Sequence, residues 1–286
     1  MRVSATCAEC LFDKQRHLKN DPAYLEEVRQ ILESRTEEDT SPYLVYLFHQ
    51  ARERRFGKES PYADIKKEFN TLVLSMEEGL REKIGSSPDP LAEALVMARA
   101  GNYIDFGAMT HVDRDTFLSL FDDLSLSAHD KETLKSFRGE CRKAGTFLLI
   151  ADNCGEIILD RLFLEELKKE FPQLSLTVLV RGEEILNDAT VEDALFAGMD
   201  KAAEIIDNGG PVAGTVWSTL PCRAKEALEK ADVILAKGQG NYESLSGQGR
   251  HVFYSFLCKC SLFTRRFGVP PLTGMFAEEM RSGEIK

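Results

Sequence analysis

The chain has 286 residues, of which 43% are hydrophobic and 29% are charged, so it has enough apolar sequence for a sizeable core in one large domain or two modest ones. Its 47 acidic residues outnumber its 36 basic ones, and the resulting net charge of −11 argues against non-specific binding to nucleic acid or to an anionic membrane. No run reaches the roughly 18 apolar residues of a membrane span, and the first residues, with Asp13 close behind, lack the apolar centre of a signal peptide. We therefore expect a cytoplasmic protein that binds neither nucleic acid nor membrane.

The first half of the chain is predicted to be helical. Pro22 fits the first turn of a helix that Asp21 caps. Residues 62–83 carry a stripe of apolar side chains at helical spacing. Further helices are predicted over 42–56, 88–100, 113–124 and 129–144. We therefore assign a helical N-terminal region to residues 1–145.

From residue 146 the pattern changes to short β-rich runs that alternate with helical stretches. Strands are predicted over 146–152, 175–181, 204–206, 232–237 and 251–257, and helices over 155–170, 190–198 and 222–230, with a loop after residue 237. Such alternation predicts right-handed βαβ units, which build a parallel sheet covered by helices on both faces. We therefore expect an α/β domain over residues 146–286.

Polar side chains follow several of these strands at the point where each strand ends. Asp152 and Asn153 come directly after the first strand, Asp188 follows the second, and Lys237 ends the fourth. Because ligands of open parallel sheets bind outside the carboxyl ends of the strands, we expect these side chains to share one rim. Carboxylate and amide oxygens suit a hard divalent cation, and a lysine suits a phosphate.

Each of these residues also has a simpler interpretation. Asp152, Asn153 and Asp188 all precede predicted helices and are suitable N-caps, although capping and metal ligation do not exclude each other. Lys237 lies beside Gly238, and glycine lets a backbone approach an anion closely, but a lysine at a strand end is usually solvated. The segment has neither P-loop spacing nor a dinucleotide fingerprint.

Asn102 and Asp105 interrupt the helical half of the chain. They either end one helix and cap the next, or lie on a loop that reaches over the sheet rim and contacts a substrate. Both interpretations stay open.

Two pairs of cysteines lie near opposite ends of the chain, Cys7 with Cys10 and Cys258 with Cys260. Seven cysteines in a long chain without a visible export signal favour free thiols over a disulfide framework. We predict that the two pairs approach each other and hold a soft metal ion, with packed free thiols as the alternative. Cys154 has no histidine near it in sequence to activate it as a nucleophile.

The segments DNCGEIILD (152–160), NDAT (187–190) and KGQGNYE (237–243) resemble the metal-dependent damage-control phosphatases of the domain-of-unknown-function-89 family. The segment GNYIDF (101–106) and the early Cys7-x-x-Cys10 look like the prokaryotic-type branch of that family. The resemblance covers nearly the whole chain, and the combination of motifs is more specific than any one of them.

The resemblance implies a fold, a metal site and a substrate class. The fold is a three-layer α/β/α Rossmann-like sandwich with a helical N-terminal region. A divalent cation (Mg²⁺, Mn²⁺, Co²⁺ or Ni²⁺) is held by Asp152, Asn153 and Asp188, and Lys237 lies near the phosphate. The substrates are small phosphorylated metabolites, such as sugar phosphates or damaged cofactor precursors.

We therefore expect a metal-dependent phosphatase, whose cation activates a water and stabilises the charge that develops during phosphoryl transfer. Glu156 would orient a metal ligand without binding the metal itself. Asp152 would either ligate the metal or attack the phosphorus itself. Two alternatives remain. One is a Rossmann-like methyltransferase, against which the absent glycine-rich loop counts, and the other is a non-catalytic metal- or metabolite-binding protein.

Overall fold

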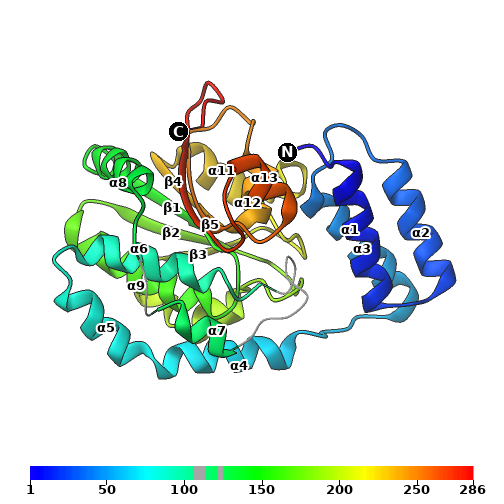
Figure 1. Cartoon of the computed structure of the whole chain (residues 1–286), viewed down its shortest axis with the longest axis horizontal. Coiled ribbons are helices and arrows are strands. Elements are labelled where there is room, and N and C mark those ends of the chain that lie inside the picture. The colour runs from blue at the N-terminus through cyan, green and yellow to red at the C-terminus, as the bar shows by residue number, and fades with distance from the viewer. Residues whose placement is uncertain (106–113, 122–124, 286) are drawn as a thin grey trace.

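A single mixed sheet organises the C-terminal half of the protein (Figure 1). The structure, a computed structural model, describes residues 1–105, 114–121 and 125–285. The strands are β1 (Thr146–Ile150), β2 (Ser175–Val180), β3 (Glu204–Asp207), β4 (Val233–Lys237), β5 (Val252–Leu257) and β6 (Gly274–Glu279). Their order is β3-β2-β1-β4-β5-β6, in which the first five are parallel and β6 pairs antiparallel with β5.

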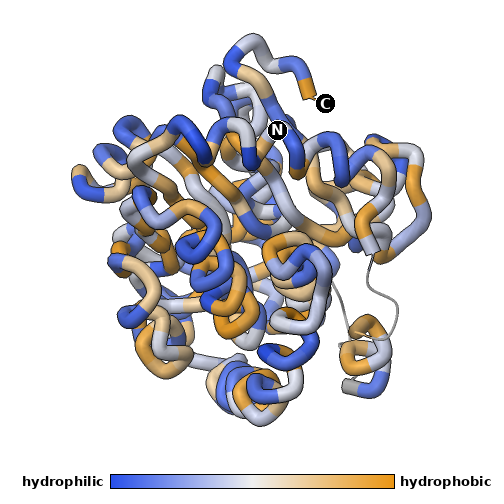
Figure 2. Tube along the Cα trace, turned by 90° about the vertical axis from the view of Figure 1, so that its left-hand side faces the viewer, coloured by the Kyte–Doolittle hydropathy of each residue, from blue (hydrophilic) through white to orange (hydrophobic). Residues whose placement is uncertain are grey.

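The central strands are buried on both faces, as parallel strands in a layered α/β protein are. Phe147 and Leu149 of β1 join one hydrophobic cluster, while Leu148 and Ile150 join a second cluster on the other face. Successive side chains of a strand point to opposite faces, so one short apolar run contributes to two cores. In Figure 2 the helices around the sheet carry both apolar (orange) and hydrophilic (blue) residues, as helices that pack one side against a core do.

Helices cover both faces of the sheet. One face packs against α9 (Glu156–Glu170), with α6 (Pro90–Gly101) and α8 (Ala128–Cys141) in the same cluster. The other face packs against α11 (Cys222–Lys230), α12 (Gly238–Leu245) and α13 (Ser261–Phe267). The predicted three-layer α/β/α architecture is therefore confirmed. The remaining short elements are α10 (Val191–Phe196) and two 3₁₀ turns, Met199–Lys201 and Trp217–Thr219.

The helical N-terminal region divides its packing between two cores. Helices α1 (Ala5–Leu18), α2 (Pro22–Glu33) and α3 (Ser41–Phe56) form a cluster of their own at the right of Figure 1. Helices α4 (Ala63–Ser75) and α5 (Glu77–Ser86) instead contribute to the core beneath the sheet. The sheet begins at Thr146, and the division into two domains at residue 145 stays a prediction.

Several sequence-based expectations need correction. The predicted helix over 62–83 is two helices, because the backbone breaks at Met76, which caps one and begins the next. The expected loop after Lys237 is helix α12: its glycines have poor helix propensity, but burial of Tyr242 and Leu245 against the sheet outweighs that preference. Strand β6 and helix α13 were not predicted.

The helix predicted over 113–124 lies partly outside the described residues; within them α7 spans Arg114–Ser119. None of the helices in the described part of the chain combines the length and the apolar character needed to cross a lipid bilayer.

Candidate functional site

Two chain segments meet at the carboxyl ends of β1 and β2. Asn153 and Asp188 form an isolated antiparallel bridge, with Cys154 N donating to Asn187 O at 2.9 Å and Ala189 N donating to Asp152 O at 2.8 Å. The backbone itself therefore brings Asp152, Asn153 and Asp188 together, although 34 residues separate Asn153 from Asn187 in sequence. The expected convergence of these three side chains at one rim is present.

A buried arginine links the two carboxylates. Arg181, which directly follows β2, donates from Nε to Asp188 Oδ2 at 2.7 Å and lies 3.5 Å from Asp152 Oδ1 through Nη2. Its Nη1 donates to Asn241 Oδ1 at 3.4 Å, and its side chain is fully buried. Sequence reasoning did not assign Arg181 a role. The available signal was a charged residue placed immediately after a fully apolar strand.

Two amides and Glu156 support Asp152 from the other side. Asn102 Nδ2 donates to Asp152 Oδ2 and to Glu156 Oε2, both at 3.0 Å. Asn153 Nδ2 donates to the same two oxygens at 2.8 Å and 3.0 Å. Glu156 thus accepts hydrogen bonds from both amides. This is the arrangement expected of a residue that orients metal ligands without contacting the metal itself.

The capping interpretation of these residues is wrong in most cases. Helix α9 has Gly155 at its N-cap without a side-chain cap bond, so neither Asp152 nor Asn153 caps it. Helix α10 is capped by Thr190 in a capping box, so Asp188 is not its cap. Asn102 does occupy the C-cap position of α6, and its side chain reaches Asp152 as well.

Lys237 lies behind the rim and is fully buried. Its ammonium donates to Ala98 O at 3.0 Å, to Glu156 Oε1 at 2.7 Å and to Asp160 Oδ1 at 2.6 Å. Burial raises the pKa of Asp160 to about 7, while the charge of Lys237 opposes that rise. All three donors of an ammonium are used here, so the predicted phosphate contact requires Lys237 to leave one of these acceptors.

A second lysine, Lys259, lies near enough to Asp152 for its charge to lower the pKa of that carboxyl. It follows β5, its side chain is fully buried, and its Nζ donates to Asp105 Oδ2 at 2.6 Å. Asp105 itself lines a cavity together with Asp152 and Asp188. Sequence reasoning missed Lys259, because a lysine just after a strand is usually solvated and nothing in the local sequence indicates that this one is buried.

The site concentrates negative charge in a buried place. Burial, reinforced by the charges of Asp188 and Glu156, raises the pKa of Asp152 well above its ordinary value, and Lys259 opposes this rise. Burial likewise raises the pKa of Asp188 to about 6 against the opposing charge of Arg181. Carboxylates that repel one another out of contact with bulk water favour a bound cation.

The donor set of Asp152, Asn153 and Asp188 consists of two carboxylates and one amide, so every oxygen it offers suits a hard divalent cation rather than a soft one. These residues therefore fit the metal that the sequence predicts, and their roles as ligands stay predictions.

The cavity in front of the carboxylates has a volume of about 180 Å³. Cys7, Cys10 and Cys260 line it, whereas Cys258 is buried and does not. Among the described residues, no group of three or more histidine, cysteine or acidic side chains is placed to hold a metal ion. The two cysteine pairs thus contribute to one region, but the soft-metal site of Cys7, Cys10, Cys258 and Cys260 stays a prediction.

Gly238 provides space for the Asp152 carboxylate. Its φ is +77°, and a Cβ atom there would lie 1.9 Å from Asp152 Oδ2. We expect Gly238→Ala to displace Asp152 and to lower the affinity for divalent cations at least tenfold, measured by calorimetry. Gly247→Ala is the matched control, because Gly247 has a φ of +82° but open space around it. Gly247→Ala should lose only about 1–2 kcal/mol of folding stability, because of backbone strain. Equal cation affinities in the two variants would contradict this role of Gly238.

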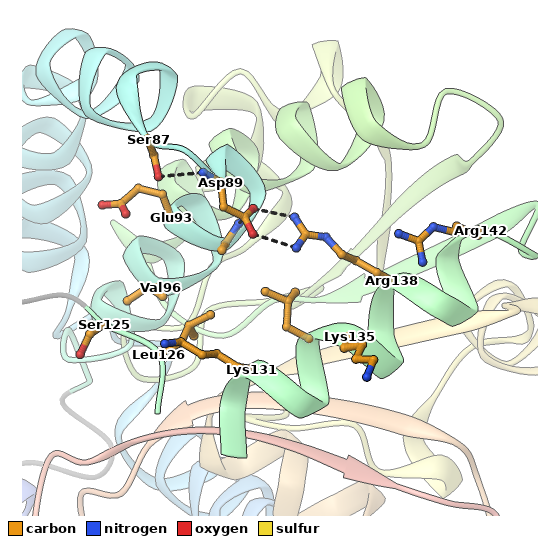
Figure 3. Close-up of a pocket in the computed structure, with 12 residues that line it drawn as sticks. Ser87, Asp89, Glu93, Val96, Ser125, Leu126, Lys131, Lys135, Arg138 and Arg142 are labelled. Carbon is orange, nitrogen blue, oxygen red and sulfur yellow. Dashed lines mark hydrogen bonds and ion pairs between the residues drawn. The ribbon is translucent and has the colours of Figure 1, made fainter. Parts of the chain in front are cut away.

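A second cavity, of about 450 Å³, lies between the start of α6 and α8, away from these carboxylates (Figure 3). Arg138 crosses it to pair with both oxygens of Asp89, at 2.6 Å and 2.8 Å. Its walls contain none of the candidate residues, and its central arginine is already paired. We therefore assign the site to the rim.

The fold and the rim together define an α/β/α protein with a buried site of oxygen donors and basic side chains, suited to a cation and an anionic substrate. The sequence profile of the damage-control phosphatase ARMT1-like domain matches residues 3–272. The chain is 31% identical to a damage-control phosphatase of Archaeoglobus fulgidus over 94% of this chain and 96% of that protein. It is 28% identical to a damage-control phosphatase of Pyrococcus horikoshii over 75% and 73% of the two chains.

The crystal structure of a DUF89 family protein from Pyrococcus horikoshii matches this fold with a TM-score of 0.80, at 24% identity, over 96% of this chain and 98% of that one. The chain belongs to the damage-control phosphatase ARMT1-like family, which the sequence motifs predicted. Membership supports a phosphatase that acts on damaged metabolites.

Proposed function

We propose that this protein is a divalent-metal-dependent phosphatase that hydrolyses small phosphorylated metabolites, such as sugar phosphates or damaged cofactor precursors. The observation that carries the proposal is the pairing of segments 152–154 and 187–189, which turns two buried carboxylates towards one cavity. The names of the archaeal relatives support the same reaction class.

Asp152, Asn153 and Asp188 would hold the cation, which when bound polarises the phosphoryl group and lowers the pKa of a bound water. Asn102 and Glu156 fix the orientation of Asp152 and Asn153 through the hydrogen bonds described above. A site held rigid before substrate arrives spends little free energy on reorganisation during the reaction.

Lys259 is our choice for the residue that neutralises the phosphoryl oxygens. Among the described residues, its buried ammonium has Asp105 as its one hydrogen-bonded acceptor, whereas Lys237 has three. A phosphoryl group in the cavity offers the oxygens that the remaining donors of Lys259 can bind. Lys237 instead keeps Glu156 in place, which is a positioning role.

Chelation tests the metal dependence. Treatment with EDTA should lower phosphate release from a panel of phosphoesters by at least a hundredfold, because the two carboxylates would then repel both each other and the substrate. Addition of excess Mg²⁺, Mn²⁺, Co²⁺ or Ni²⁺ should restore it. A metal-free protein that hydrolyses the panel at full rate contradicts the proposal. Metal binding without turnover on any phosphoester would instead support a non-catalytic binding protein.

A further inference from the structure

The N-terminal helices contribute much of the wall of the 180 Å³ cavity. Helix α1 supplies Cys7, Cys10 and Leu11, and α3 supplies Ser41 and Val45. This volume is below the roughly 300–1,000 Å³ of pockets for drug-sized ligands, so the cavity suits a small molecule. Since the carboxylates occupy the rim, these helices face the part of a substrate that is not the phosphoryl group.

The side chains of this wall are mainly apolar. The apolar ones come from α1, α3, α13 and the loop before Asp188, and they are Leu11, Pro42, Val45, Leu186, Leu262 and Phe263. The same wall also contains the polar residues Thr6, Lys14, Gln239 and Ser261. Leu186 has a φ of +50°, which a leucine adopts only at a cost in free energy, so the surrounding structure holds it there against that strain. An alkyl group packed against these apolar side chains is removed from water, which favours its binding.

Glu243 of α12 is an acidic residue in this wall. Its Oε1 accepts a hydrogen bond from Ser41 Oγ at 3.0 Å. Its other carboxyl oxygen has no hydrogen-bond partner among the residues that the structure describes and is not sealed from the cavity. Burial raises the pKa of Glu243 to about 7, and Ser41 opposes the rise, so near neutral pH the group both donates and accepts hydrogen bonds.

On the basis of the proposed function, we infer that the wall formed by α1, α3 and α13 binds a mainly apolar organic group of the phosphorylated substrate, with a hydroxyl at its far end held by Glu243. The preferred substrate class is therefore an ω-hydroxyalkyl-type phosphoester rather than a simple alkyl one.

Two four-carbon substrates test this inference: n-butyl phosphate and 4-hydroxybutyl phosphate. We expect kcat/KM for 4-hydroxybutyl phosphate to exceed that for n-butyl phosphate by about tenfold, on the order of one well-formed hydrogen bond. Equal values, or a preference for n-butyl phosphate, would overturn the inference while leaving the phosphatase activity itself established.

Two variants assign the preference to Glu243. Glu243→Met should bring the kcat/KM values for butyl and 4-hydroxybutyl phosphate within about twofold of each other, since it removes the hydrogen-bonding group but keeps the length of the side chain. Glu226→Met is the control, because Glu226 is exposed on α11 outside the cavity, and the tenfold ratio should survive there. An unchanged ratio in Glu243→Met would contradict the proposal that Glu243 binds the hydroxyl of the substrate.

Thiol protection in the wild-type protein tests the binding without turnover or substitution. Cys10 and Cys222 are both exposed, but only Cys10 of the two lines the cavity. With Mg²⁺ present, 4-hydroxybutyl phosphate should slow alkylation of Cys10 by iodoacetamide at least threefold, and inorganic phosphate should slow it less, while Cys222 reacts unchanged. If inorganic phosphate protects Cys10 as well as 4-hydroxybutyl phosphate does, the organic group does not bind against this wall. Protection without hydrolysis would instead contradict the proposed reaction and keep the binding site.

Discussion

Asp152→Ala and Asp188→Ala should each reduce metal-dependent phosphoester turnover on the order of a thousandfold, because each removes several kcal/mol of charge stabilisation and every 1.4 kcal/mol is about tenfold in rate. Both proteins should remain folded. Each variant removes one of two carboxylates beside Arg181 and leaves the other to pair with it. Calorimetry should show that divalent-cation affinity falls together with turnover.

Asp200→Ala is the matched control for these variants. Asp200 is an exposed acidic residue of the 3₁₀ turn Met199–Lys201, away from the rim, and its loss should change neither quantity. Near-wild-type turnover by either rim variant at saturating metal would contradict the assignment of the metal ligands.

The sheet was predictable because its strands are short, apolar and bounded by polar sequence. Strands β1, β2 and β4 are buried along nearly their whole length, and such runs separated by amphipathic helices admit few other arrangements. Strand β6 was not predictable in the same way. The position of its residues GMFAEE depends on antiparallel pairing with β5, a contact that local sequence does not encode.

The rim was predictable where chemistry and strand ends coincide. Asp152, Asn153 and Asp188 follow two adjacent strands, and the parallel-sheet rule alone brings them together. Arg181 and Lys259 also follow strands, but a basic residue at a strand end is usually solvated, so burial had to be seen before either was assigned a role. Sequence reasoning placed Lys237 at the correct strand end without showing that its side chain points behind the rim.

The two buried lysines should respond in opposite ways to replacement by methionine. Lys237→Met leaves Glu156 and Asp160 buried without their cation, and breaking such a pair costs about 3–5 kcal/mol of stability. Lys259→Met leaves only Asp105, which borders the cavity and can be solvated there, so the loss of stability should be smaller. Turnover per folded molecule should fall at least a hundredfold in Lys259→Met, the amount expected when a group that stabilises developing charge is removed.

Urea denaturation and turnover, measured on the same samples, separate the two roles. Lys237→Met should unfold at a clearly lower urea concentration than Lys259→Met, and the folded fraction of each should be used to normalise its rate. A double variant, Lys237→Met with Asp160→Leu, should recover part of the lost stability, because it removes one of the two unpaired carboxylates. If Lys237→Met is as stable as the wild type yet loses turnover while retaining metal affinity, Lys237 binds the phosphate and Lys259 does not. The three acceptors around its ammonium lead us to expect the reverse.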